Sequence, residues 1–224
     1  MDVFLADGTG TGTNITPTGT SQPSLAAAGI MRADARRNRD AIVCAARELF
    51  AEKGMDAQMD EIARRAKVGV GTVYRHFPAK EDLLDGLITR RFERLAERAA
   101  EAVRTASLED PWEAFRGFIE WSAALQAGDR ALSEAMATRS ERMHAAAVAS
   151  GLITQLGLLL ELTKRAGALR EDLVVEDIPA IVCSIGSVAV AAAEKPHWRW
   201  DRVLAIWLDG VRAPGHIALP PLKN

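Results

Sequence analysis

A short stretch in the first half of the chain constrains the fold more than any other part of the sequence. Residues 58–77 read QMDEIARRAKVGVGTVYRHF, and PAKEDLL follows directly. In the first half of this stretch, apolar residues recur at the three- and four-residue spacing of one helix face: Met59, Ile62, Ala63 and Ala66. In the second half, Val73 and Phe77 are spaced so that both turn inward. The pattern predicts two short helices joined by a tight turn.

The second of these helices is expected to present polar side chains on its free face. With Val73 and Phe77 turned inward, the residues left to face outward are Thr72, Tyr74, Arg75 and His76. Hydroxyl, phenol and cationic groups on a short helix, held at a steep angle by a preceding helix, suit insertion into the major groove of DNA. The alternative interpretation is an ordinary pair of surface helices.

This region resembles the N-terminal domain of the tetracycline-repressor (TetR) family of bacterial transcriptional regulators. The matching runs are AARELFAEKG at 45–54, DEIARRA at 60–66 and GTVYRHFPAKEDLL at 71–84, in the order and at the spacing typical of the family. The rest of the chain matches only in length and helical character. The resemblance implies a sequence-specific DNA-binding regulator, by family default a repressor released from its operator by a small, largely apolar ligand.

Charge is divided unevenly along the chain. The net charge of the whole chain is only −2. Residues 32–80 contain 11 basic and 7 acidic residues, a net charge of +4, whereas residues 105–224 contain 12 basic and 15 acidic residues, a net charge of −3. Because contact with phosphate requires positive charge, the basic segment is the expected DNA-binding part.

The predicted fold class is all-α, because no alternating apolar pattern of useful length indicates a strand. Helices are expected at about residues 33–53, 59–66, 70–77, 80–104, from 111 on, 130–147, 149–166, 175–194 and 200–212. The resemblance implies a three-helix helix-turn-helix domain that the fourth helix joins to a larger helical domain for ligand binding and dimerisation. The expected division is a disordered tail at 1–31, the DNA-binding domain at 32–80, the regulatory and dimerisation domain at 81–213 and an irregular tail at 214–224. Met31 is a second candidate for the native first residue.

The resemblance also implies which residues face DNA. They are Arg36, Arg37, Gln58, Val70, Gly71, Thr72, Tyr74, Arg75, His76 and Lys80. Thr72, Tyr74, His76 and Gln58 would contact the phosphate backbone, and Lys80 would bind phosphate as a point charge. Val70 would make only apolar contact with a base, and Arg75 would either read a guanine or clamp a phosphate. The arginines at the entry of the first helix, Arg32, Arg36, Arg37 and Arg39, form either a basic arm along the phosphate backbone or a solvated charged face.

Two positions depart from the family pattern. Lys67 stands in the turn where the family favours glycine, and a residue with a side chain is strained there if its φ is positive. Gly69 replaces the usual serine-type N-cap of the second short helix, which weakens the start of that helix by a few tenths of a kcal/mol.

A homodimer is expected, because one recognition helix buries too little surface for tight, specific binding, and a symmetric pair would read the two half-sites of a palindromic operator. The last two long helices carry apolar residues on more sides than an exposed helix tolerates. The predicted interface residues are Ile181, Ile185, Val188, Ala192, Val203 and Trp207. The alternative is that these helices form only the core of the monomer.

A ligand pocket is implied by the resemblance and not by the residues themselves. Aromatic and methionine side chains in the middle helices suit an apolar ligand, and one histidine lies near them. The candidates are Trp112, Phe115, Trp121, Met136, Met143, His144, Leu152 and Leu156. A stripe of this composition at helical spacing is more often plain core, and that alternative stays open.

Other classes of protein find little support in the sequence. The histidines are scattered, and no HExxH, GxSxG, P-loop or CxxC pattern occurs, so we expect no enzyme, no metal site and no cofactor. Cys44 and Cys183 lie in apolar runs and are expected to be small buried side chains. The alternatives to a regulator are a DNA-binding architectural protein and a helical small-molecule-binding protein without regulatory DNA binding.

No apolar run approaches the ~18 residues of a membrane span, so no membrane contact is expected. The first 31 residues also lack the positive start and apolar core of a secretory signal. We therefore expect a cytoplasmic location.

Overall fold

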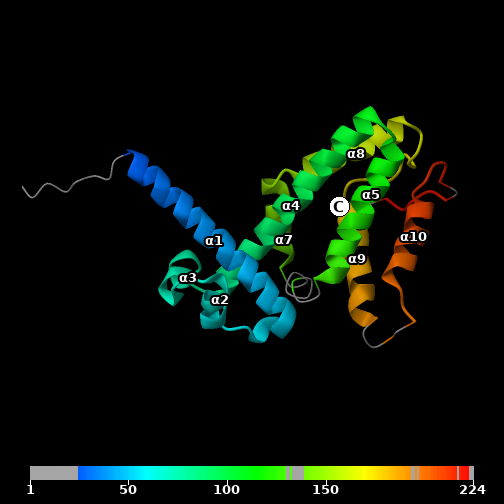
Figure 1. The fold of residues 1–224 in the computed structure, drawn as a ribbon. Helices are drawn as coiled ribbons and strands as arrows, with labels where there is room; N and C mark the ends of the chain where they lie inside the picture. The colour runs from blue at the N-terminus through cyan, green and yellow to red at the C-terminus, as the bar shows by residue number, and fades with distance from the viewer. Residues whose placement is uncertain are drawn as a thin grey trace, which may run out of the picture. The chain divides into compact units, whose positions relative to one another are not determined.

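The computed structural model describes residues 25–129, 132, 139–192, 195, 197–215 and 217–221, without the side chains of residues 25–32 and 55. Within these ranges every regular element is a helix, and an isolated antiparallel bridge pairs Leu169 with Arg212 (Figure 1). The predicted all-α fold class is confirmed. The chain divides into two compact units, residues 1–37 and 38–224, and the packing described below is that of the second unit.

The first helix, α1 (Leu25–Lys53), begins earlier than the predicted start at Ala33. Residues 25–28 read Leu-Ala-Ala-Ala, which are strong helix formers, and the last proline before them is Pro23. The structure thus places residues 25–31, predicted as part of a disordered tail, in this helix. The rest of the expected disordered tail, residues 1–24, lies outside the described residues.

The second unit starts with what we call the head, residues 38–77. It contains the end of α1, the 3-10 turn η1 (Gly54–Asp56), α2 (Met59–Ala66) and α3 (Val70–His76). Helical spacing places one stripe of α1 in the apolar core, and its buried members are Ile42, Ala45, Ala46, Leu49 and Phe50. Cys44 lies two positions after Ile42, on the opposite side of α1, and is exposed. Its predicted burial is therefore wrong.

The remaining helices form what we call the body, residues 80–221. They are α4 (Lys80–Leu108), α5 (Pro111–Gly128), α7 (Ser140–Ala149), α8 (Leu152–Arg165), α9 (Asp177–Ala191) and α10 (Trp200–Gly210). The long helix α4 packs against α5, α7 and α8, and α5 also packs against α9 and α10 (Figure 1). α4 follows α3 directly and then runs through the body. It therefore connects the head to α5, α7 and α8, the helices that pack against it.

Local chemistry explains several helix ends in the body. The Asp110 carboxylate accepts a hydrogen bond from the Trp112 amide at 2.9 Å, and Pro111 occupies the first turn of α5. Gly151, at φ 78°, makes the sharp turn between α7 and α8. The helix predicted at 130–147 is described only in part, since α7 begins at Ser140 and residues 133–138 lie outside the described residues.

Length and apolar composition give limited support for a membrane span. No single helix in the described ranges is long and apolar enough to cross a membrane, although α7 and α8, bent by 70° at their junction, meet the criteria as a pair. Leu152, Leu156, Leu159 and Leu160 of α8 are buried in the core. A buried core helix meets the same criteria, so the bent pair is weak evidence for a membrane span.

The chain after α10 has no helix within residues 213–215 and 217–221, as expected for an irregular tail. Arg170 and Asp172 hold this segment against the body. The Asp172 carboxylate accepts from the Leu219 amide at 2.8 Å, and the Arg170 guanidinium donates to the Ile217 carbonyl.

Candidate nucleic-acid interface and internal cavities

The turn between α2 and α3 fixes the angle at which α3 is presented. Lys67 adopts the left-handed conformation, with φ 57° and ψ 39°. The Val68 amide then donates to the Ala63 carbonyl at 3.1 Å, which closes the end of α2. A residue with a side chain in this conformation costs about 1–2 kcal/mol. The strain expected at Lys67 is present.

The helix α3 has one buried side chain, Val73, and offers most of its surface to solvent. Val70 is 47% exposed and Tyr74 is 50% exposed. Gly71 and Arg75 are exposed as well, while Thr72 is half-buried. Large apolar and aromatic side chains this exposed on so short a helix suit contact with a partner.

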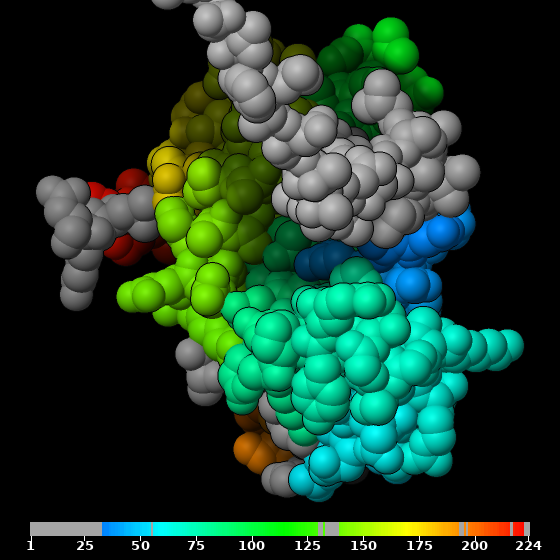
Figure 2. All heavy atoms as spheres, turned by 90° about the vertical axis from the view of Figure 1, so that its left-hand side faces the viewer, coloured from blue at the N-terminus to red at the C-terminus, as the bar shows by residue number. Residues whose placement is uncertain are grey.

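Figure 2 looks toward the face formed by α2 and α3, whose cyan and teal atoms make a broad, convex surface in its lower half. The major groove of DNA is wide enough to admit an α-helix, so a short exposed helix on a convex surface can enter it.

His76 is half-buried and so less exposed than Tyr74 and Arg75, and its predicted contact with DNA stays a prediction. Its Nε2 atom is buried and has no hydrogen-bond partner among the described residues. The reason is helical spacing, because position 76 lies one turn after the buried Val73. Burial, followed by the positive charges of Arg75 and Arg39, lowers the pKa of His76 below its ordinary value of 6.5.

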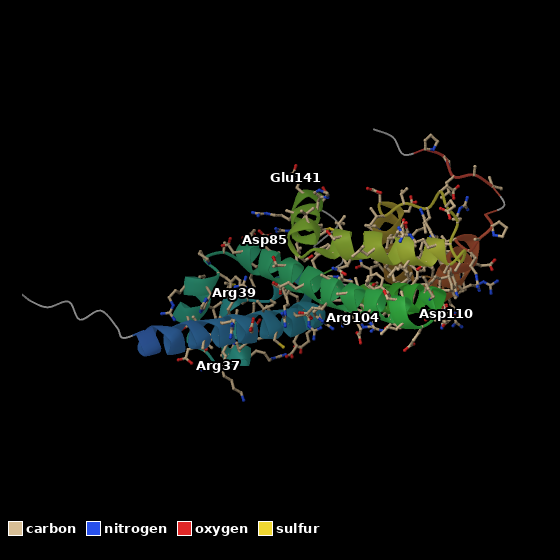
Figure 3. All side chains as sticks on the ribbon, turned by 90° about the horizontal axis from the view of Figure 1, so that it is seen from above. Arg37, Arg39, Asp85, Arg104, Asp110 and Glu141 are labelled. Atoms are coloured by element: carbon tan, nitrogen blue, oxygen red, sulfur yellow. The ribbon has the colours of Figure 1, made fainter. Side chains whose placement is uncertain are left out.

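Arg39, a cation at the entry of the first helix that is not among the ten residues predicted to face DNA, lies at this end of α3. Its guanidinium lies 5.2 Å from the centre of the Phe77 ring, and it is exposed (Figure 3). Arg39 and Arg75 are thus both close enough to His76 to act on its charge, which places two cations where α3 ends. A phosphate group would lower the energy of these charges.

Gln58 and Lys80 flank the recognition helix and make contacts of their own. The backbone amide of Gln58 donates to the Glu61 carboxylate at 3.2 Å, and the Gln58 side-chain amide donates to the Asp56 carbonyl at 2.9 Å. The Lys80 ammonium lies 5.6 Å from the centre of the Phe50 ring. Both side chains are anchored on the head, near the start of α2 and of α4.

The other two predicted contacts, Arg36 and Arg37, belong to the N-terminal unit. Both are exposed, and Arg37 forms an ion pair with Asp34 on the same helix.

Ion pairs between α1 and α2 steady the helix that supports α3, and sequence reasoning missed them. Arg65 donates to both carboxylate oxygens of Glu52, at 2.9 and 3.0 Å, and Lys53 donates to Glu61 at 2.6 Å. These contacts raise the pKa of Arg65 and lower the pKa values of Glu52 and Glu61. All lie at the surface, where solvent screens the charges, so these pairs contribute little to stability.

The body contains a small, partly open cavity of about 80 Å³, which we call the body cavity, between α4, α5, α7, α8 and α9. Three of the predicted ligand residues line it: Met143, Leu152 and Leu156. Its other walls include Phe92, Leu95, Phe118 and Val182, and three polar residues, Arg91, Ser122 and Gln126.

The other ligand candidates lie elsewhere. Trp112 and Phe115 are buried core residues, and the Phe115 ring packs 6.3 Å from that of Trp207. Trp121 is half-buried and His144 is exposed on α7, and neither lines the body cavity. The aromatic stripe of α5 is thus mainly core, the alternative left open above. Met136 lies outside the described residues.

A second concavity of about 260 Å³, which we call the arginine-lined hollow, lies between α1, α4 and the end of α5. Its walls carry four arginines and two carboxylates: Arg47, Arg90, Arg91, Arg94, Asp40 and Asp129. Arg91 belongs to both sites and was not among the sequence candidates. Within the described residues, no group of three or more metal-binding side chains is placed to hold an ion.

The predicted dimer residues divide between core and surface. Ile185 is fully buried within this single chain, so it belongs to the monomer core and its predicted place at the interface is wrong. Trp207 is half-buried against Phe115, and Ile181, Val188 and Ala192 are half-buried on α9. Val203 is 40% exposed.

Ile206 of α10, which is not among the six predicted interface residues, is 65% exposed. The hydroxyl groups of Ser184 and Ser187 on α9 donate to carbonyls of their own helix, so their donors need no hydrogen bond from water. The exposed side of α9 is therefore less polar than its sequence suggests. Cys183 on this helix is exposed, so its predicted burial is wrong.

Comparison with known proteins gives matches over both parts of the chain. The family model for bacterial regulatory proteins of the tetR family matches residues 42–87. The model for the C-terminal domain of SbtR-like transcriptional regulators matches residues 110–213. The first match contains α2 and α3, and the second contains the helices from α5 to α10.

Individual relatives agree with these matches. The chain is 34% identical over 127 residues to the HTH-type transcriptional repressor KstR of Rhodococcus jostii (strain RHA1), over 56% of this chain and 57% of that protein. The aligned stretch thus spans little more than half the length of this curated relative.

Solved structures are matched over nearly their whole length. A TetR transcription regulatory protein from Mycobacterium vanbaalenii is 34% identical, with a TM-score of 0.60 over 82% of this chain and 99% of that one. Thermus thermophilus FadR, a TetR-family repressor solved in complex with lauroyl-CoA, is 25% identical, with a TM-score of 0.55 over 83% of this chain and 98% of that one.

Proposed function

This chain belongs to the TetR family of transcriptional regulators, and we propose that it is a sequence-specific DNA-binding repressor that a small ligand releases from its operator. The observation that carries the proposal is the free face of α3. Val70, Tyr74 and Arg75 are exposed on a helix whose opposite side is fixed by the buried Val73. A helix held rigidly on one side and exposed on the other is what reading a major groove requires.

Each exposed group then has a role that its chemistry supports. The hydroxyls of Thr72 and Tyr74 bond phosphate oxygens, and Arg39, Arg75 and Lys80 supply positive charge around them. Val70 offers an apolar contact for a thymine methyl group. Arg75 also has the fork of donors that pairs with a guanine edge, so it is the residue we assign to sequence reading.

We propose that the repressor acts as a homodimer on a palindromic operator and works in the cytoplasm. The exposed Val203 and Ile206 on α10, next to the surface of α9 that carries Ser184 and Ser187, support a self-association surface there. Pairing two heads would place two copies of α3 on successive half-sites.

The ligand is proposed to act through α4. Leu83 and Leu84 of this helix are buried in the core at its head end, and Phe92 and Leu95 line the body cavity further along. A ligand that widens the cavity would shift α4 and so favour an arrangement of the heads with lower affinity for DNA. The complex of Thermus thermophilus FadR with lauroyl-CoA makes acyl compounds the first candidates.

The test is selection of bound duplexes from a random library by the purified chain, followed by sequencing. We expect a palindromic motif. Tyr74→Phe should weaken binding to all sequences alike, by about 1 kcal/mol, because it removes one phosphate contact. Arg75→Ala should cost about 1–3 kcal/mol and relax the preference at one base pair in each half-site.

The matched control is Arg104→Ala, which removes an exposed arginine near the far end of α4 (Figure 3). It should leave both affinity and preference unchanged. Equal binding to every duplex would support the architectural alternative, and wild-type affinity in both α3 variants would refute the assignment of α3 to DNA.

A further inference from the structure

Arg91 is placed where the helical pattern of α4 calls for an apolar residue. It follows the buried Leu87 by four positions and precedes Leu95, which lines the body cavity, by four. Only 6% of its surface is exposed. The neighbouring arginines of α4 are solvated instead, and Arg90 and Arg98 pair with Glu93 and Glu101. Burying a guanidinium is costly unless its donors and its charge are satisfied.

The partners of Arg91 satisfy it only in part. One of its terminal nitrogens, Nη2, donates to Oε1 of Gln126, while the other, Nη1, is buried without a partner among the described residues. Asp129 attracts the charge through space, and burial is the main effect that lowers the pKa of Arg91. An arginine stays charged in proteins, so an unused donor and a positive charge remain inside the body.

Two groups on α5 complete this polar cluster. Ser122 and Gln126 are one turn apart on the same side of the helix, and both line the body cavity with Arg91. The Ser122 hydroxyl is also buried without a partner in the described part of the chain. The cluster therefore holds a donor from Arg91 and a hydroxyl from Ser122 that no described group uses.

Gly186 on α9 allows Gln126 to take its position. A Cβ atom added at Gly186 would lie 2.6 Å from Cγ and 2.8 Å from Nε2 of the Gln126 side chain. Such distances are too short for any residue with a side chain unless Gln126 moves. The backbone of α9 thus approaches the amide that holds Arg91 in place.

The surroundings of Arg91 are apolar on one side and cationic on the other. The body cavity, on one side, is lined mainly by apolar and aromatic side chains such as Phe92, Phe118 and Leu156. The arginine-lined hollow, on the other, carries further arginines, whose charge Asp40 and Asp129 offset in part.

From this arrangement we infer that the regulatory ligand is an amphiphile, with an apolar chain in the body cavity and an anionic group held by Arg91. Its anion would accept from Nη1 of Arg91 and from the Ser122 hydroxyl, and a larger head group would extend into the arginine-lined hollow. The inference rests on the proposed function, because it takes the body cavity as the regulatory site. Free fatty acids and acyl thioesters of coenzyme A share this chemistry.

The size of the cavity adds a consequence. A volume of about 80 Å³ is far below the ~300 Å³ or more that a bound organic ligand commonly occupies. An acyl chain would therefore need the cavity to widen, and α4 is one of the helices that line it. Binding of the amphiphile is thus expected to act on the helix that leads to the head.

The experiment measures calorimetric binding of three probes to the full chain: dodecanoate, dodecanoyl-CoA and the neutral dodecanol. We expect at least one anionic probe to bind about 10- to 100-fold more tightly than dodecanol, the ratio that one charge-assisted contact in a buried site provides. Arg91→Met should abolish this preference, because it weakens binding of the anionic probes far more than binding of dodecanol.

Controls separate the charge of Arg91 from its packing. Arg98→Met removes a half-exposed arginine of α4 that pairs with Glu101 outside both sites, and it should change none of the three affinities. The comparison of anionic and neutral probes in the wild-type chain tests the inference even if Arg91→Met does not fold. If the arginine-lined hollow binds the head group of dodecanoyl-CoA, Arg90→Gln should weaken binding of dodecanoyl-CoA and not of dodecanoate. This result distinguishes an acyl thioester from a free fatty acid as the source of the anion.

The inference is overturned if no anionic probe binds, if dodecanol binds as tightly as both anionic probes, or if Arg91→Met weakens all three equally. Operator binding is measured with the same preparations, so that a failure of this inference can be told from a failure of the proposed function. A chain that binds its operator but no anionic probe contradicts this inference alone. A chain that binds an anionic probe through Arg91 without releasing the operator contradicts the proposed regulation alone.

Discussion

Gly86 and Arg91 are close together on α4, yet the two positions are packed in opposite ways. At Gly86, a Cβ atom would lie 2.9 Å from Cε1 of Phe77, so the helix rests directly on the residue that ends α3. At Arg91, two concavities approach the helix from different sides, and a buried donor lacks a partner among the described residues. The first position fixes α4 to the head, whereas the second leaves α4 adjustable within the body.

This difference suggests how one helix can serve both recognition and regulation. Reading base pairs requires that α3 keep a fixed orientation, which close packing between Phe77 and Gly86 provides. Response to a ligand requires a site whose packing can change at low cost, and a cavity with unsatisfied polar groups meets that need. A shift of α4 that starts near Arg91 would be passed on to Phe77 at the end of α3, because the backbone of α4 at Gly86 lies close against the Phe77 ring.

The largest expected effect comes from breaking the tight contact. Gly86→Ala forces a methyl group against the Phe77 ring, and overpacking of this kind costs about 1–3 kcal/mol of unfolding free energy. The same change should weaken operator binding, because α3 can no longer seat against α4. Chemical denaturation and a DNA-binding titration measure the two effects.

A matched substitution in the body gives the other half of this comparison. Gly157 on α8 has no atom within 4 Å of an added Cβ, so Gly157→Ala should raise stability by up to about 1 kcal/mol through helix propensity. If the two variants changed stability by the same amount and in the same direction, the contrast between the head end of α4 and the body would be unfounded.

Sequence reasoning reached the helices and most of the recognition face, because both follow from local patterns. The spacing of Ile62, Val73 and Phe77 fixes which sides of α2 and α3 are buried, and the structure buries all three. His76 was assigned to the outward face by residue type, although its position one turn after Val73 turns its imidazole partly inward. The roles of the individual residues in DNA binding stay predictions.

The polar cluster in the body was out of reach for another reason. The periodicity of α4 alone places Arg91 on the apolar stripe, and this signal was available in the sequence. The sequence could not show why Arg91 stands on this stripe, because Gln126, Ser122 and Gly186 come from two other helices. Only the packing of those helices shows that Arg91 is buried beside a cavity. Ile185 was misassigned for a similar reason, since an apolar stripe does not reveal whether α5 or a second subunit covers it.

A smaller effect is expected where the head stores strain. Lys67 has φ 57°, a conformation that glycine adopts without penalty. Lys67→Gly should therefore stabilise the chain by about 0.5–1 kcal/mol, the relief of strain less the added freedom of glycine in the unfolded state. Lys67→Ala keeps the strain and serves as the control. Thermal unfolding that shows the same gain in both variants would assign the effect to loss of the lysine charge.

The smallest effect concerns the pH dependence of the head. Because burial and the charges of Arg75 and Arg39 lower the pKa of His76 below 6.5, the unfolded chain takes up a proton at a higher pH than the folded chain. Stability attributable to His76 is therefore intact above pH 6.5 and is lost as the pH falls from there toward the lowered pKa. His76→Gln should flatten this part of the stability curve. Arg75→Gln should narrow the pH range over which stability is lost, because one of the charges that lower the pKa of His76 is removed. Denaturant titrations between about pH 5 and 7.5 measure the slope. A slope that His76→Gln leaves unchanged would show that the imidazole is solvated in the folded chain, and would return His76 to the outward face of α3.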